Sequence, residues 1–198
     1  MSLLSRLKGR LVREKNRIII SRVKRKLHTK DCTLISQNCI GGVFYHDMGM
    51  QFLSPMINTF IPEPGFVKLA LNLRHYMEQE LVMRWEEEYP VGLLGDVEIH
   101  FMHYESCKEA KECWERRKAR INWDKILVLG TDRDGFDEAV YEQWKQIDYP
   151  KLLFTAHAEF AEDAVYYPEY EEDGQVGDLI SGRSFYRYNI LCNKIRNC

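Results

Sequence analysis

The segment from Thr33 to Gly42 constrains the fold more than any other part of this chain. An apolar run there ends in small polar residues, and a cysteine and two glycines follow. This pattern predicts a β-strand that ends in a tight turn, with the Cys39 thiol at the turn. Because ligands of α/β proteins bind at the carboxyl ends of strands, we expect the functional site near this turn.

Short apolar segments alternate with segments of helical periodicity along the rest of the chain. We expect strands at 32–36, 97–103, 125–129 and 152–155, and helices at 62–82, 106–120 and 136–147. The alternation predicts an α/β fold, a layered α/β/α architecture with a mainly parallel or mixed sheet. The length of 198 residues suits a single domain of this class at 31–198, preceded by a leader at 1–30.

The leader is strongly basic, whereas the remainder of the chain is acidic. Residues 1–30 hold eleven lysines and arginines and a single acidic residue, Glu14. Apolar residues recur there at helical spacing, which predicts a basic amphipathic helix over 3–27, broken near Asn16. Two interpretations remain open: adsorption to an anionic membrane surface, or a solvated helix that packs one apolar stripe on the domain.

The composition limits which binding partners and which cellular location we expect for the protein. The net charge of −2 argues against nucleic-acid binding by the chain as a whole. The six cysteines form no CxxC pair, so a zinc site is not expected. No signal peptide or run of about 20 apolar residues is present. We therefore expect free thiols and a cytoplasmic location, with the inner face of the bacterial membrane as the surface that the leader would contact.

Cys39 is a candidate nucleophile. Backbone amides at Gly41 and Gly42 would lower the pKa of its thiol and would bind an oxyanion or a phosphate. His100 and His103 are the candidate bases, and strand alternation places Glu98 and His100 on one face and His103 on the other. The alternative is a small buried thiol behind a glycine turn.

A second candidate site follows the apolar run at 126–129. Asp132 and Asp134 stand two residues apart just past the expected strand end, a spacing that lets two carboxylates share a divalent cation. Such a cation would hold the diphosphate of a nucleotide sugar. The alternative is a turn in which one aspartate caps the next helix. Asn38, Arg133 and Trp123 are further candidates for substrate binding.

A set of short motifs follows in a fixed order along the chain: Ile35–Gly42, Ser54–Pro55, Tyr89–Gly92, Glu98–Tyr104, Ala110–Arg117, Arg120–Trp123, Asp132–Gly135 and Gln175–Asp178. In these motifs the chain resembles a bacterial family catalogued as domain of unknown function nineteen-nineteen, over roughly residues 30–185. Members are often described as exopolysaccharide biosynthesis proteins or as acetyltransferases. The resemblance implies an α/β fold and a surface-polysaccharide context, and it supplies no catalytic residue. Because the family usually begins near the first strand, the basic leader looks like an addition to it.

The function that we expect is a sugar-modifying transferase of exopolysaccharide or capsule synthesis, acting on a sugar or a lipid-linked sugar. In one mechanism Cys39 accepts an acyl group from acyl-CoA, with a histidine as base. In the other, Asp132 and Asp134 bind a divalent cation and a nucleotide sugar, and a histidine deprotonates the acceptor hydroxyl. The rival interpretation is a non-catalytic assembly factor that binds glycan or partner enzymes.

Overall fold

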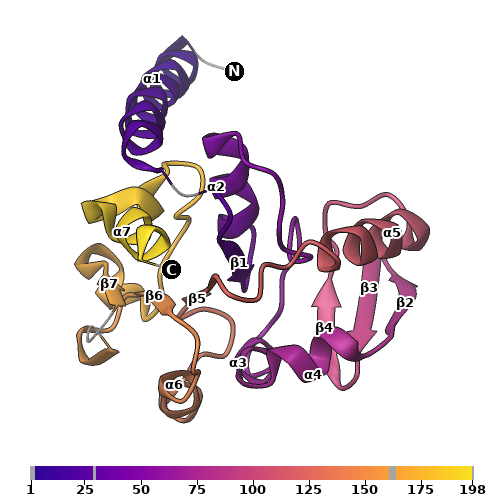
Figure 1. Cartoon of the computed structure of the whole chain (residues 1–198). Helices are drawn as coiled ribbons and strands as arrows, with labels where there is room; N and C mark the ends of the chain where they lie inside the picture. The colour runs from indigo at the N-terminus through magenta and orange to yellow at the C-terminus, as the bar shows by residue number, and fades with distance from the viewer. Residues whose placement is uncertain (1–2, 29, 161–163, 198) are drawn as a thin grey trace.

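The computed structural model describes residues 3–28, 30–160 and 164–197 (Figure 1). Its centre is a four-stranded sheet with the strand order β1-β5-β6-β7, in which every neighbouring pair is parallel. The strands are β1 (Thr33–Ser36), β5 (Ile126–Thr131), β6 (Lys151–Thr155) and β7 (Ala164–Tyr166). The expected α/β class with a parallel sheet is therefore confirmed.

The sheet separates two apolar cores. Along β1 and β5 the side chains alternate, so Ile35 and Val128 enter one core and Leu34 and Leu127 enter the other. Because both faces are buried, these strands appear in the sequence as continuous apolar runs. One core is covered by the following helices: α1 (Leu3–Lys26), α2 (Ile40–Met48) and α7 (Ile190–Arg196).

The other core is covered by α3 (Gly65–Leu71), α4 (Leu73–Glu78), α5 (Cys107–Lys118) and α6 (Glu138–Lys145). Short 3₁₀ turns complete the chain: η1 (Ala158–Phe160), η2 (Pro168–Asp173) and η3 (Ser184–Asn189). Ser106 caps α5, because its Oγ accepts a hydrogen bond from the Glu109 amide.

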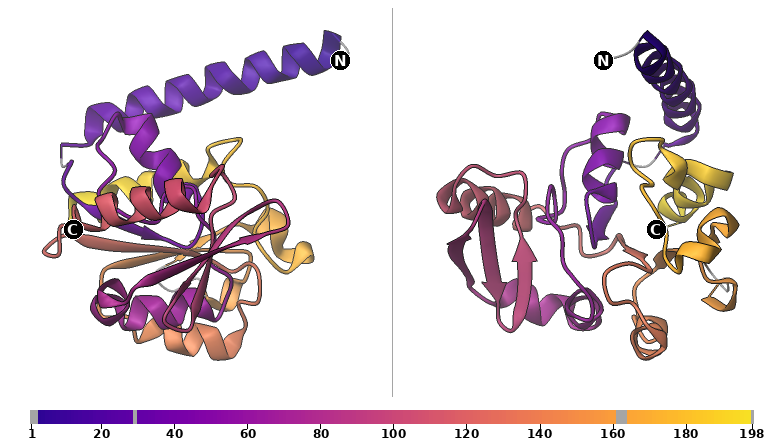
Figure 2. Two further views of the ribbon diagram at one scale, coloured as in Figure 1. Left: turned by 90° about the vertical axis from the view of Figure 1, so that its right-hand side faces the viewer. Right: turned by 180° about the vertical axis from the view of Figure 1, so that it is seen from behind.

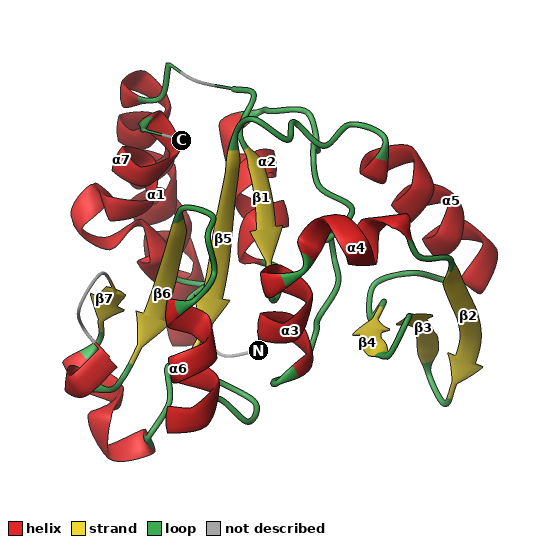
Figure 3. Ribbon diagram, turned by 60° about the horizontal axis from the view of Figure 1, so that its bottom comes forward, coloured by secondary structure: helices red, strands yellow, loops and turns green. Residues whose placement is uncertain are grey.

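A second, antiparallel sheet lies beside the first and was not predicted from the sequence (Figure 3). Its strands are β2 (Leu81–Glu86), β3 (Tyr89–Leu94) and β4 (Val97–His100). The predicted helix at 62–82 is accordingly too long: Asn72, at φ −124°, separates α3 from α4, and Leu81 begins β2. The predicted strand at 97–103 ends at His100 and does not neighbour β1.

Helix α1 is continuous, so the predicted break near Asn16 is wrong. Its C-terminal part packs against the body through Val23, and Leu27 follows directly after the helix. Both side chains are buried in the same core as α2 and α7. Asn16 Nδ2 donates a hydrogen bond to the Ser181 carbonyl at 3.0 Å. The N-terminal part extends beyond the rest of the molecule (Figure 2). Among the described residues, no helix has the length and hydropathy that a membrane span requires.

Candidate functional site

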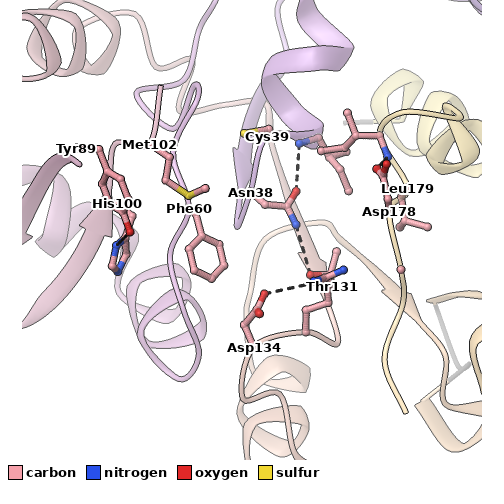
Figure 4. A pocket seen from close by; sticks show the side chains of 14 residues that line it. Asn38, Cys39, Phe60, Tyr89, His100, Met102, Thr131, Asp134, Asp178 and Leu179 are labelled. Carbon is pink, nitrogen blue, oxygen red and sulfur yellow. Dashed lines mark hydrogen bonds and ion pairs between the residues drawn. The ribbon is translucent and has the colours of Figure 1, made fainter. Parts of the chain in front are cut away.

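A cavity of about 520 Å³ opens at the carboxyl ends of β1 and β5, on the side that faces the antiparallel sheet (Figure 4). Its volume falls within the range of small-molecule sites. The lining residues are Asn38, Cys39, Ile40, Phe60, Tyr89, His100, Met102, Thr131, Arg133, Asp134, Gly177, Asp178, Leu179 and Ile180. The parallel sheet supplies one wall, the antiparallel sheet the opposite wall, and the loop before η3 a third.

The segment Phe60–Ile61 connects the two sheets. The Ile61 amide donates a hydrogen bond to the carbonyl of Gln37, directly after β1, at 2.9 Å. Phe60 and His100 exchange two backbone hydrogen bonds of 2.8 and 2.9 Å at the end of β4. This bridge brings His100 to the cavity although its strand belongs to the other sheet.

His100 is held by partners on both sides of its ring. Nε2 lies 3.1 Å from Glu98 Oε1, and Nδ1 lies 3.3 Å from the Tyr89 hydroxyl. Glu98 in turn accepts a hydrogen bond from Arg84 on β2. The predicted shared face of Glu98 and His100 is thus confirmed, and a carboxylate–histidine pair stands at the cavity wall.

Cys39 lines the opposite wall, immediately before α2 (Figure 4). Burial raises the pKa of its thiol, which is the reverse of the lowering that we expected from the turn. No hydrogen bond joins Cys39 to His100, since both histidine nitrogens have other partners. The thiol therefore lacks both features that activate a cysteine nucleophile in this state.

The first amides of α2 are already occupied. The Ile40 amide donates to Asn38 Oδ1 at 3.1 Å, and the Gly41 amide donates to Ser36 Oγ at 3.2 Å. Gly41 and Gly42 are buried and do not line the cavity. A Cβ on Gly41 would stand 2.8 Å from the Cβ of Ser36, so close packing of helix on strand explains this glycine.

Asp132 is a structural residue, whereas Asp134 faces the cavity. The buried Asp132 carboxylate accepts hydrogen bonds from the Ala156 and Val176 amides at 2.6 and 2.8 Å and from the Thr155 hydroxyl at 2.9 Å. These bonds tie β5 to the end of β6 and to the loop before η3. Among the described residues no group of three carboxylate, histidine or cysteine side chains converges as a metal site. The cation that Asp132 and Asp134 were expected to share stays a prediction, and three hydrogen bonds already occupy the Asp132 carboxylate.

The other predicted substrate-binding residues are divided between the cavity and distant surfaces. Asn38 and Arg133 line the cavity, and Arg133 Nη1 donates to the Val176 carbonyl at 3.0 Å. His103 lies in an exposed turn beyond β4, outside the cavity. The Trp123 ring packs beneath the Arg74 guanidinium at 4.4 Å, in a different hollow.

A series of hydrogen-bonded polar side chains lies beneath the cavity and was not predicted from the sequence. Gln37 Oε1 accepts hydrogen bonds from the Thr131 amide and hydroxyl, and Gln37 Nε2 donates to Glu63 Oε1 at 3.1 Å. Thr131 also accepts from Asn38 at 3.4 Å. Burial raises the pKa of Glu63 to about 8, with a contribution from the nearby Asp134 carboxylate, although a hydrogen bond from the Val67 amide lowers it. The only sequence signal is that Gln37 and Thr131 are polar residues at strand ends.

The pKa of Glu63 gives a pH-dependent stability. The carboxyl ionises near pH 4.5 when exposed and near 8 when folded. Between these values the unfolded chain releases a proton that the folded protein keeps, so rising pH favours unfolding. We expect the free energy of unfolding of the wild type to fall relative to Glu63→Gln by up to about 1.4 kcal/mol per pH unit.

Urea unfolding of both proteins between about pH 5 and pH 8 measures this difference. The exposed Glu88, replaced as Glu88→Gln, is the matched control and should follow the wild-type pH profile. Parallel profiles for the wild type and Glu63→Gln would show that Glu63 ionises in the folded state like an exposed carboxyl.

Because the pKa of Cys39 is raised, we expect its thiol to be alkylated slowly. In the folded protein at neutral pH, we expect Cys39 to react with iodoacetamide more slowly than free cysteine, because less of it is thiolate. Peptide mass spectrometry after timed quenching gives the rate for each cysteine, and Cys39→Ser identifies the Cys39 peptide. Alkylation faster than that of free cysteine would restore Cys39 as an activated nucleophile.

Comparison with known proteins assigns the chain to a family. The family model described as Domain of unknown function (DUF1919) matches residues 11–194. The match begins inside α1, so the expectation that the basic leader precedes the family region is wrong. An uncharacterized protein of Haemophilus influenzae is 34% identical over 184 residues, which cover 88% of this chain and 89% of that protein. The chain belongs to the DUF1919 family.

Proposed function

We propose that the protein transfers a group to a hydroxyl of a sugar or lipid-linked sugar in exopolysaccharide or capsule synthesis, with His100 as the general base. The observation that carries this proposal is the Glu98–His100 pair at the wall of the cavity. A histidine that is oriented by a carboxylate and faces a ligand-sized cavity is the arrangement used for proton abstraction from a hydroxyl.

The hydrogen bonds around His100 define how it would act. With Nε2 donating its N–H to the Glu98 carboxylate, Nδ1 is the nitrogen that would accept a proton. Nδ1 is contacted only loosely, at 3.3 Å, by the Tyr89 hydroxyl. A substrate hydroxyl would replace this contact, give its proton to Nδ1 and attack the acyl carbon of acyl-CoA or the anomeric carbon of a nucleotide sugar. The C–S or C–O bond to CoA or to the nucleoside diphosphate would break. Glu98 would stabilise the imidazolium, which then gives its proton to that leaving group.

The rest of the lining suits a sugar. Phe60, Met102 and Leu179 offer apolar surface for the carbon face of a ring, and Asn38 and Asp178 offer amide and carboxylate groups for its hydroxyls. Arg133 is the cationic side chain among the lining residues and would contact the diphosphate of a nucleotide sugar or of acyl-CoA.

Direct transfer is favoured over an acyl-enzyme on Cys39. The pKa of the thiol is raised, and no base is hydrogen-bonded to it. In direct transfer, Cys39 takes no part in the chemistry and only contributes a small side chain to the cavity wall opposite His100. We also propose that the reaction takes place at the inner face of the membrane, where α1 would hold the protein near a lipid-linked acceptor.

Substitution of His100 tests the proposal. Purified protein is incubated with acetyl-CoA or with UDP- and GDP-sugars, with and without manganese, and with hexoses or a polyprenyl-linked sugar. Products are detected by mass spectrometry. With the donor that the wild type uses, His100→Gln should lower the rate at least about 100-fold, the size of a general-base contribution.

His103→Gln is the matched control, because His103 is exposed and lies outside the cavity. It should leave the rate within about twofold of the wild type, since it removes no group that general-base catalysis uses. Ligand-induced thermal shifts measured on the same samples separate binding from turnover. Equal rates for His100→Gln and the wild type would refute the mechanism. Thermal shifts without turnover for every donor would favour the non-catalytic assembly factor.

A further inference from the structure

We propose that the groove between α1 and η3 binds the phosphate group of an anionic phospholipid. The groove encloses about 410 Å³ and is separate from the cavity that contains His100. Its lining residues are Lys15, Ile19, Arg22, Val23, Lys26, Gly182, Arg183, Ser184, Tyr186, Arg187 and Asn189. The inference rests on the membrane location proposed above and not on the transfer reaction.

The groove has a surplus of positive charge. Five of its lining residues are lysines or arginines, and none is acidic. Two of the five form ion pairs with carboxylates that do not line the groove: Arg183 pairs with Asp47, and Arg187 pairs with Glu169. In the described part of the chain, no carboxylate forms an ion pair with the three cations on α1, which are Lys15, Arg22 and Lys26. A bound anion would therefore meet cations without a competing internal partner.

The side of the groove opposite α1 is held in place by buried polar contacts. The Asp47 carboxylate is 4% exposed and accepts two hydrogen bonds from Arg183, at 2.6 and 3.2 Å. The Tyr186 hydroxyl donates to the same carboxylate at 3.2 Å. Arg183 Nη1 also donates to the Ile180 carbonyl at 2.6 Å. This network fixes the guanidinium and the aromatic ring before any ligand arrives.

The same face of α1 carries exposed apolar side chains, and this favours a lipid over a soluble phosphate. Leu11, Lys15, Ile18 and Arg22 follow one another at steps of four, three and four residues, so they form one stripe. Leu11 is 71% exposed and Ile18 is 51% exposed. A stripe of cations and exposed apolar residues is the pattern of a helix that lies in a membrane interface. The N-terminal part of α1 extends away from the body, where a bilayer can reach it (Figure 2).

Charge removal on two faces of the same helix tests the groove. The full chain is sedimented with vesicles of phosphatidylcholine mixed with phosphatidylglycerol, and with phosphatidylcholine alone. The groove variant is Lys15→Gln, Arg22→Gln and Lys26→Gln. The matched control is Arg13→Gln, Arg17→Gln and Lys24→Gln, which removes the same charge from exposed positions outside the groove. Circular dichroism and the thermal midpoint verify that both variants fold.

We expect the wild type to bind the anionic vesicles and not the neutral ones. The groove variant should lose at least ten times more affinity than the control variant. Equal losses would mean that only the total charge of α1 matters, and this would overturn the proposal. Leu11→Ser with Ile18→Ser should also lower vesicle binding at least tenfold, and unchanged binding would refute insertion of the stripe.

Two further measurements distinguish a phospholipid from a soluble phosphate and from RNA. Glycerol 3-phosphate at constant ionic strength should not release the protein from vesicles at millimolar concentration, because it lacks the acyl chains that Leu11 and Ile18 would contact. Release would reassign the groove to a soluble phosphate and overturn the lipid proposal. Retention of an RNA duplex by the wild type, lost in the groove variant, would likewise overturn it. These results are independent of the His100 test, so either proposal can fail alone.

Discussion

The hydrogen bonds of the Phe60–Ile61 segment are the constraint on which the cavity depends. The parallel and antiparallel sheets share no strand pair, and yet their ends form two walls of one cavity. Ile61 is fully buried and bonds to the end of β1, while Phe60 pairs with His100 at the end of β4. Together with the apolar core that side chains of both sheets share, this bridge holds the Glu98–His100 pair opposite the end of β1.

The floor of the cavity depends on a second kind of constraint, a buried polar chain. Gln37 and Thr131 stand at the ends of neighbouring parallel strands and bond to each other, and the chain continues to Glu63 on one side and Asn38 on the other. Buried polar groups are costly unless each has a partner, and a fully satisfied chain of them fixes one arrangement. The strand ends that line the cavity are thereby held in register.

The sequence allowed the parallel sheet to be predicted because its strands are buried on both faces, and continuous apolar runs such as Ile126–Leu129 are easily recognised. It did not reveal the antiparallel sheet, since β2 exposes Val82 and Trp85 and its apolar residues continue the helical spacing of the segment before it. Cys39, Asn38, Arg133, Asp134 and His100 were candidates taken from two separate sequence motifs and a strand, and the fold brings them to one cavity. Trp123 and His103 were misplaced, because the positions of their loops depend on tertiary contacts that no local pattern encodes. Glu63 was missed for the same reason, because its contacts with Gln37 and with the Val67 amide arise only in the folded chain.

The proposed function requires that one cavity, between the ends of β1 and β4, binds the substrate. Methyl NMR of methionine-labelled protein tests this directly, because Met102 lines the cavity and is 49% exposed, whereas Met77 is buried in a core. Met102→Leu assigns its signal. We expect any sugar or donor that raises the thermal midpoint to shift the Met102 methyl resonance and to leave that of Met77 in place. A stabilising ligand that leaves the Met102 resonance unperturbed would show that the substrate binds elsewhere.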